Sequence, residues 1–292
     1  MKILVTGGHG YLGGYICQSL IEAGHEVVSI DVKSDQSSVS KSILADFSDK
    51  KTLEFSLKKA DALIHLAAIS GVSKASSDPI TCVNVNIDKL LILLEMVRQK
   101  RPTLKFFFMS TYDLVDKNNG KRLAEDALDS IYQYSKYCGE LMCDLFSQNH
   151  DLNIKIIRPS TLFGINNFKG PRVLNTFIKA ALADNPIQVH DPQKLLTFTS
   201  VIDIGASIQT NLNSKLTNKE FRKPVNIVSP EKYTLIELAY LIKTSLSSKS
   251  EILSAKNMSF HVAKGLTELE TQKARKGQGS LLIDWLNSIR SL

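Results

Sequence analysis

Two side chains near the middle of the chain have the types and spacing for proton transfer. Tyr132 and Lys136 lie four residues apart in a stretch that predicts a helix over about residues 132–148, so they share one helix face. A phenol has a reference pKa of about 10 and is a poor base at neutral pH. A neighbouring ammonium favours the phenolate and lowers that pKa. The pair could therefore move a proton to or from a substrate oxygen, with an ordinary surface Tyr/Lys pair as the alternative.

A glycine-rich segment near the start of the chain could bind a phosphate group. The sequence TGGHGYLG, from Thr6 to Gly13, lies between an apolar run and a helical pattern. Its glycines allow a tight turn and a close approach of the backbone to a pyrophosphate, which would face a helix N-terminus. Asp31 ends the next apolar run, where its carboxylate can accept hydrogen bonds from an adenosine ribose and would repel a 2′-phosphate. This pattern predicts NAD as the cofactor, and Lys33 leaves NADP possible.

The elements that must position these residues can be read from the apolar pattern. Strands are expected at residues 3–5, 27–30, 62–66, 106–109, 154–157 and 225–228, and helices at 11–23, 83–98, 132–148, 172–183 and 235–246. The alternation predicts an α/β fold, a Rossmann-type, doubly wound parallel sheet over residues 1–165 with a returning segment near 199–229. After Gly164 the alternation weakens. We therefore expect residues 166–292 to form mainly a small C-terminal substrate-binding lobe.

Two hydroxyl side chains follow the strand expected at 106–109. Ser110 and Thr111 would emerge at the carboxyl edge of the sheet, where ligands bind in folds of this kind. Either could contact a bound molecule, and a simple strand-end cap is the alternative.

The ordered set of motifs resembles the extended short-chain dehydrogenase/reductase family, the NAD-dependent epimerase/dehydratase group, over about residues 1–240. The matching segments are TGxxGxxG at 6–13, Asp46-Phe47, His65-Leu66-Ala67-Ala68, Asp78-Pro79 with Asn86, the YxxSK…E pattern from Tyr132 to Glu140, and the RPxxxYG-like turn from Arg158 to Gly164. The resemblance implies Tyr132 as the acid/base and Lys136 as its partner, which also holds the nicotinamide ribose. It implies Thr111 as the hydroxyl that bonds the reacting oxygen, although some relatives would align Tyr112 there.

The resemblance also implies a set of cofactor contacts. They are Gly7, Gly10, Tyr11, Leu12, Gly13, Asp31, Asp46, Phe47, Leu66, Ala67, Ala68, Asn86, Ser110, Tyr132, Lys136 and Pro159. No cluster of His and Cys has metal-ligand spacing, so no metal is expected. His9 is expected only to line the glycine loop.

The expected substrate is a nucleotide-activated sugar, on which the family performs epimerisation, dehydration or ketone reduction. Family dehydratases follow the catalytic Thr with Asp-Glu, whereas Tyr112 and Asp113 stand here, so dehydration is disfavoured. The usual diphosphate-binding Arg precedes a strand that we expect to end in Val201-Ile202-Asp203; that position is Leu196, with Lys194 as a possible substitute. An epimerase or a keto-sugar reductase remains. The alternatives are a reductase of a non-sugar ketone or alcohol, and a non-catalytic dinucleotide-binding regulator.

Composition narrows the remaining classes. The net charge is +7 but no Lys/Arg run exceeds two residues, which favours a mildly basic surface over nucleic-acid binding. No apolar run approaches the ~18 residues of a membrane span, and the apolar start is too short for a signal peptide. The four cysteines are far apart or on apolar helical stretches and form no CxxC, so they are expected to be reduced, buried thiols of a cytoplasmic protein. The helix from Val83 to Val97 is apolar nearly all round, which predicts a homodimer.

Overall fold

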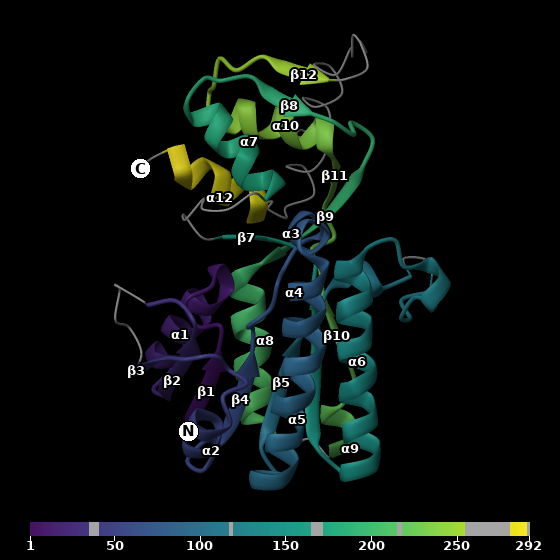
Figure 1. The fold of residues 1–292 in the computed structure, drawn as a ribbon. Coiled ribbons are helices and arrows are strands. Elements are labelled where there is room, and N and C mark those ends of the chain that lie inside the picture. Colours follow the sequence, from purple (N-terminus) through teal and green to yellow (C-terminus); the bar gives the residue numbers. More distant parts are fainter. Residues whose placement is uncertain (35–40, 117–118, 165–171, 215–217, 255–280, 291–292) are drawn as a thin grey trace. The chain divides into compact units, whose positions relative to one another are not determined.

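The chain divides into two compact units. The computed structural model describes residues 1–292 apart from 35–40, 117–118, 165–171, 215–217, 255–280 and 291–292. One unit contains Met1–Ser160 and Ile202–Ile227, and the other contains Thr161–Val201 and Val228–Leu292. Figure 1 labels the helices and strands of both units.

A seven-stranded sheet forms the centre of the first unit. The strand order is β10-β6-β5-β4-β1-β2-β3, and every pair is parallel. The strands are β1 (Lys2–Thr6), β2 (Glu26–Asp31), β3 (Lys41–Leu44), β4 (Ala62–His65), β5 (Lys105–Met109), β6 (Asn153–Pro159) and β10 (Val225–Ile227). The chain runs outward from β1 in one direction and then from β4 in the other. The predicted doubly wound parallel sheet is confirmed, with its topological switch point between β1 and β4.

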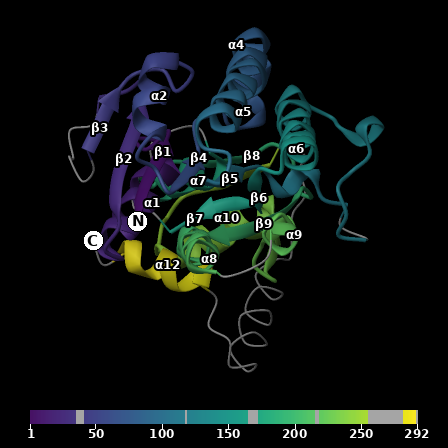
Figure 2. The same ribbon diagram turned by 90° about the horizontal axis from the view of Figure 1, so that it is seen from below.

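Helices cover both faces of this sheet. They are α1 (Tyr11–Glu22), α2 (Lys50–Leu57), α3 (Val72–Ser77), α4 (Pro79–Val83), α5 (Lys89–Lys100), α6 (Ile131–His150), α8 (Val201–Asn213) and α9 (Asn218–Phe221). Seen along the strands, α2, α5 and α6 lie on one face and α1 and α8 on the other (Figure 2). Gln209 on α8 donates to the hydroxyl and carbonyl oxygens of Ser19 on α1, which holds that second layer together.

The central strands are buried on both sides, as their continuous apolar runs predict. All four residues of β4 are buried, and Phe106, Phe107 and Phe108 of β5 are at most 2% exposed. Helix α6 is capped at its N-terminus by Ser130, whose hydroxyl accepts a hydrogen bond from the Gln133 amide, and at its C-terminus by Asp151 in the left-handed conformation. The elements that carry the candidate site are therefore anchored in one core.

Two features of the helices differ from the predictions. The strand expected to end in Val201–Asp203 is wrong there: β9 (Leu195–Ser200) stops at Ser200, and α8 begins at Val201. The buried residues Val201, Ile204, Ile208 and Leu212 recur every three or four positions, which is a helical period. The helix expected over 83–98 is interrupted by a π-helical turn, η1 (Asn84–Asp88), between α4 and α5.

The second unit has its own core and two small sheets. Strand order is β11-β9-β7 in one and β12-β8 in the other, formed by β7 (Thr161–Phe163), β8 (Ile187–Val189), β9, β11 (Lys232–Thr234) and β12 (Ile252–Ser254). Its helices among the described residues are α7 (Val173–Leu182), α10 (Leu235–Ser245) and α12 (Leu281–Arg290). A capping box of Thr234 and Glu237 begins α10.

The structure bears on two expectations from composition, the state of the cysteines and the presence of a membrane-spanning helix. All four cysteines are free thiols; three are buried, but Cys138 is only half-buried because it lies on the outer side of α6. No helix in the described part of the chain is long and apolar enough to cross a membrane.

Candidate active site

The glycine loop is built by close backbone approaches between β1, α1 and the end of β4. Gly7 has φ of 76°, and a Cβ there would lie 2.6 Å from the amide nitrogen of Ala67. A Cβ on Gly13 would lie 2.1 Å from the carbonyl oxygen of Gly7. Only glycine fits at both positions, so the N-terminus of α1 packs directly against the loop.

Asp31 fastens this loop to the end of β2. One oxygen of its carboxylate accepts the His9 amide at 3.0 Å, and the other accepts the Lys33 amide at 3.0 Å. The His9 ring lies between the same segments: Nδ1 is 2.6 Å from the Lys33 carbonyl oxygen, and Nε2 is 2.9 Å from Ser42 Oγ. His9 therefore does more than line the loop, because it joins β1's loop to β2 and β3.

Asp46 and Phe47 lie on the same side of the switch point. Asp46 accepts hydrogen bonds from the amide and hydroxyl of Ser48 and an ion pair from Lys89 on α5, at 2.5 Å. Burial raises the pKa of Asp46, but the bonds from Lys89 and Ser48 outweigh it and the net pKa is lowered. Phe47 is 5% exposed and packs edge-on against His65, so its ring belongs to the core.

On the other side of the switch point, Asn86 connects the end of β4 to α6. Leu66, Ala67 and Ala68 follow β4 directly, and both the amide and the carbonyl of the next residue, Ile69, bond to the Asn86 side chain. Asn86 also donates to Ser135 Oγ at 2.9 Å. Asn86 lies in the π-helical turn η1, and its side chain is buried in the unit. The Asn86 side chain therefore holds the loop after β4 in place and does not face solvent.

Lys136 is buried at the end of β5. Its ammonium donates to the Met109 carbonyl at 2.9 Å and lies over the Phe108 ring. Burial lowers the pKa of Lys136 to about 8, while Cys82, Cys143 and Glu140 act in the opposite direction. Tyr132 lies one turn earlier on α6 and is half-buried. The predicted pair thus shares a helix face, with the ammonium fixed to β5.

Thr111 follows two residues after Met109. It is 6% exposed, and its hydroxyl accepts the Asp113 amide and donates to the Asp113 carboxylate, both at 3.2 Å. It also begins the short 3₁₀ turn of residues Tyr112–Leu114, which is the strand-end cap considered above. Because Met109 accepts the Lys136 ammonium, Thr111 and Lys136 lie at the same end of β5.

Residues 3–214 match the family model described as the NAD dependent epimerase/dehydratase family. The chain belongs to this family. Among curated relatives it is 27% identical over 271 residues to the uncharacterized UDP-glucose epimerase YtcB of Bacillus subtilis, covering 86% of this chain and 84% of that protein. It is 24% identical to UDP-glucuronic acid decarboxylase 1 of Danio rerio, of which it spans 62%. Among solved structures, UDP-glucuronic acid 4-epimerase from Bacillus cereus, in complex with UDP-glucuronic acid and NAD, is 25% identical with a TM-score of 0.79 over 100% of this chain and 98% of that one.

Other residues expected from the family pattern lie in several places. Ser110 donates its hydroxyl to the buried Glu140 at 2.5 Å, so the side chain points into the unit. Pro159 is buried at the end of β6, and Tyr11 and Leu12 begin α1. In this epimerase/dehydratase-family chain the glycine loop, Asp31, Asp46, the end of β4, Asn86, Thr111, Tyr132 and Lys136 all belong to the first unit.

The residues discussed for the diphosphate belong to the second unit. Leu196 lies in β9 and pairs with Tyr233 of β11. Lys194 is exposed and precedes β9, and its carbonyl accepts the amide of Leu235 at the start of α10. Among the residues that the structure describes, no group of three or more His, Cys, Asp or Glu side chains could hold a metal ion.

Sequence reasoning missed the polar contacts behind the site. The family pattern includes Arg158 and Glu140 as motif positions, and nothing in the sequence pattern points to Arg122. Arg158 donates to Glu140 through Nε at 2.8 Å and Nη2 at 2.6 Å, and Arg122 donates to Glu140 at 3.3 Å. A charged residue at a helix position facing the core, as at Glu140, is the signal that could have indicated a buried ion pair.

Proposed function

We propose that this chain is an NAD-dependent enzyme that acts by hydride transfer on a nucleotide-activated sugar, as an epimerase or a keto-sugar reductase. The observation that carries the proposal is the hydrogen bond from the Lys136 ammonium to the Met109 carbonyl at the end of β5. Lys136 lies one helical turn after Tyr132, and Met109 lies two residues before Thr111. The relatives named above are UDP-sugar epimerases and a UDP-sugar decarboxylase, which supports a nucleotide sugar as substrate.

NAD fits the first unit. The glycine positions where a Cβ would collide bring the loop backbone close to the N-terminus of α1, and the free amides of a helix N-terminus are suited to a pyrophosphate. The Asp31 carboxylate stands at the end of β2, where a ribose diol would donate to it and a 2′-phosphate would be repelled. When bound, the nicotinamide supplies the hydride acceptor and donor.

The chain's own residues would handle the proton. Tyr132 takes the proton from a substrate hydroxyl, or returns it to a carbonyl. The Lys136 ammonium favours the phenolate, and Thr111 bonds the reacting oxygen. Only one carboxylate, Asp113, follows Thr111, and its amide and carboxylate already bond that hydroxyl. This arrangement favours epimerisation or reduction over dehydration.

The assembly proposed here is a homodimer through α5 and α6. Large apolar side chains remain exposed on these helices, with Leu91 at 48% and Leu145 at 54%. A second copy would cover them. Light scattering at micromolar concentration should give twice the chain mass, and Leu145→Glu should give the monomer; a monomeric unmutated protein would contradict the proposal. We also propose a cytoplasmic location, where the four free thiols stay reduced.

The proposed activity is tested with a panel of UDP- and dTDP-sugars. Purified protein with NAD should convert at least one of them, with products separated by chromatography and the cofactor redox state followed by absorbance. Tyr132→Phe is the matched control, because it removes the phenolic hydroxyl and keeps the ring. Its turnover should fall by at least ~100-fold while NAD affinity stays the same. Equal turnover in the two proteins would mean that another group moves the proton.

A further inference from the structure

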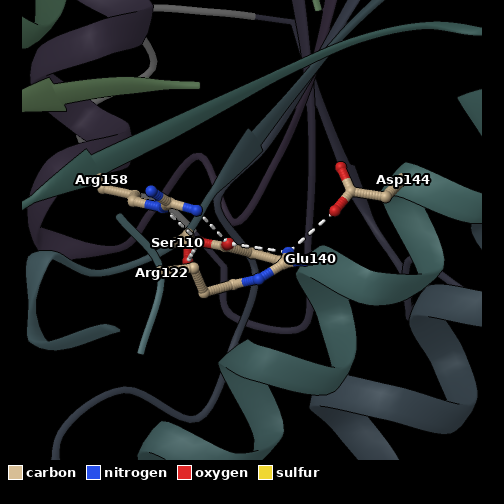
Figure 3. Close-up of polar contacts among 5 residues, drawn as sticks. All are labelled: Ser110, Arg122, Glu140, Asp144 and Arg158. Carbon is tan, nitrogen blue, oxygen red and sulfur yellow. Dashed lines mark hydrogen bonds and ion pairs between the residues drawn. The ribbon is translucent and has the colours of Figure 1, made fainter. Parts of the chain in front are cut away.

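Glu140 is a fully buried carboxylate behind the proposed proton-transfer residues. It lies on α6, four residues after Lys136, and is 0% exposed. Figure 3 shows it between Ser110 at the end of β5, Arg158 on β6 and Arg122, which comes from the segment after Thr111. A buried carboxylate is unfavourable unless it is paired and hydrogen-bonded, so its partners must be accounted for.

The Glu140 carboxylate accepts four hydrogen bonds. Arg158 forms a two-point fork with it, at 2.8 and 2.6 Å, and is itself 5% exposed. Ser110 Oγ donates at 2.5 Å and Arg122 at 3.3 Å. A fork between guanidinium and carboxylate fixes orientation as well as charge. The carboxylate thus holds one helix, two strands and one connecting segment at a single point.

Ser110 is the residue through which this point reaches the proposed site. It stands between Met109, whose carbonyl accepts the Lys136 ammonium, and Thr111. Its own amide donates to the Ile157 carbonyl of β6 at 2.8 Å. Because both the amide and the hydroxyl of Ser110 are hydrogen-bonded, the backbone of Met109 and Thr111 on either side of it has little freedom to rotate.

Arg122 brings the segment after Thr111 into the same network. Val115 forms a bridge with Arg122, and the Leu123 amide donates to the Leu114 carbonyl at 2.8 Å. Arg122 lies over the Tyr137 ring of α6 and donates to Asp144 at 2.8 Å. Asp144 is the outermost member of this network: its side chain is 36% exposed and pairs with Arg122.

We propose that Glu140, held by Arg158, is a positioning residue that fixes Ser110 so that Thr111 and Lys136 are presented together at the end of β5. This inference rests on the function proposed above. A merely structural ion pair would stabilise the unit as a whole, whereas a positioning pair controls one local segment. Isosteric neutralisation, Glu140→Gln, separates the two roles because it weakens the fork while keeping the side-chain shape.

The first measurement is hydrogen exchange by mass spectrometry on the full-length protein with NAD bound. Glu140→Gln should raise exchange by about tenfold or more in peptides covering Met109–Leu114, and leave the β1 peptides unchanged. Asp144→Asn, the matched outer control, should stay within about twofold of the unmutated protein everywhere. This readout needs no substrate, so it tests the inference even if no nucleotide sugar is turned over.

The second measurement is turnover on a substrate found in the panel. Glu140→Gln should lower kcat by about 10- to 100-fold with little change in NAD affinity, Ser110→Ala by about 3- to 10-fold, and Asp144→Asn by less than twofold. Glu140 and Cys143 on α6, Cys82 on α4 and His65 on β4 interact electrostatically with Lys136, and the proposed function adds the Tyr132 phenol. Because Glu140 raises the pKa of Lys136, the alkaline limb of the pH profile should move to lower pH in Glu140→Gln.

Two results would overturn the inference. One is a folded Glu140→Gln protein with unchanged exchange at Met109–Leu114 and unchanged turnover. The other is a rise in exchange that is equal in β1 and β5, which would make Glu140 a general stabilising residue. If Glu140→Gln does not fold, Ser110→Ala decides by the same two readouts, since it removes only one of the four bonds.

Discussion

The two sides of the switch point differ in how far their charged side chains are buried. On the β1–β2–β3 side, Asp31 binds backbone amides, and Asp46 lies near the surface with a side chain 37% exposed. On the β4–β5–β6 side, Lys136, Glu140 and Arg158 are at most 5% exposed; Lys136 donates to the Met109 carbonyl of β5, and Arg158 donates to Glu140. The first arrangement shapes a loop at little electrostatic cost, whereas the second keeps three charges away from water.

This difference has an energetic consequence. Burying a charged side chain destabilises the folded state unless its partners compensate. Glu140 and Arg158 compensate each other, but Lys136 has one carbonyl partner and a lowered pKa. The buried Lys136 ammonium should therefore destabilise the folded state, as expected for a group that is retained for catalysis.

Lys136→Met is the change with the largest expected effect. Turnover should fall by at least ~100-fold, because the Tyr132 phenol loses the ammonium that favours its ionised form. Stability should move the other way at pH 7. A pKa of about 8 against an ordinary 10.5 means that the buried ammonium costs roughly 3 kcal/mol. Loss of the hydrogen bond to the Met109 carbonyl should destabilise the variant by about 1–2 kcal/mol, which offsets part of this gain in stability.

The sign of this stability effect depends on pH and can be checked by urea unfolding. Since the pKa of Lys136 is lower in the folded state, the unfolded chain binds more protons between pH 8 and 10.5, and the unmutated protein gains stability as pH rises through that window. Lys136→Met should thus be the more stable protein at pH 7 and the less stable one above pH 10.5. A variant that is destabilised equally at both pH values would contradict the burial argument.

Asp31→Ala should have the next largest effect, on the other side of the switch point. The carboxylate loses its proposed ribose contact and releases the amides of His9 and Lys33. Each hydrogen bond to a charged group contributes about 1.5–3 kcal/mol, so NAD affinity should fall about 10- to 100-fold. The preference over NADP should narrow or reverse.

Calorimetric titration with both dinucleotides checks this. His9→Ala is the matched control: it removes the ring contacts to Lys33 and Ser42 but keeps the carboxylate, so it should weaken NAD and NADP by similar factors. Tighter NADP binding by the unmutated protein would contradict the role given to Asp31.

Much of the first unit was predictable from local patterns. The strands at residues 3–5, 62–66 and 106–109 are continuous apolar runs, and the glycine loop needs only its own spacing. Strand β3 escaped prediction because its residues lie at the sheet edge and none is fully buried. Helix α8 escaped because its first residues, Val201 and Ile202, are β-branched and follow β9 directly, so they resemble strand residues.

The site was less accessible than the fold. Tyr132 and Lys136 are helix neighbours, so their pairing follows from spacing. The partners of Glu140 are 18 to 30 residues away in sequence, and no periodic pattern relates them. The same holds for His9, whose ring contacts lie 20 to 33 residues away. Such contacts depend on which strands become neighbours, which is a property of the whole sheet.

Asp46→Asn should have the smallest effect, and it sharpens the contrast with Lys136. Hydrogen bonds from Lys89 and Ser48 lower the pKa of Asp46 despite its burial, so the carboxylate stabilises the fold above its ordinary pKa and loses that contribution as pH falls through the lowered value. Because the side chain is 37% exposed, solvent screens the ion pair with Lys89. We expect a loss of about 0.5 kcal/mol at pH 7. Urea unfolding should show that difference at pH 7 and a smaller one at pH 3. If Asp46→Asn changed the free energy of unfolding at pH 7 by as much as Lys136→Met does, charged side chains on the two sides of the switch point would not differ in their energetic effect.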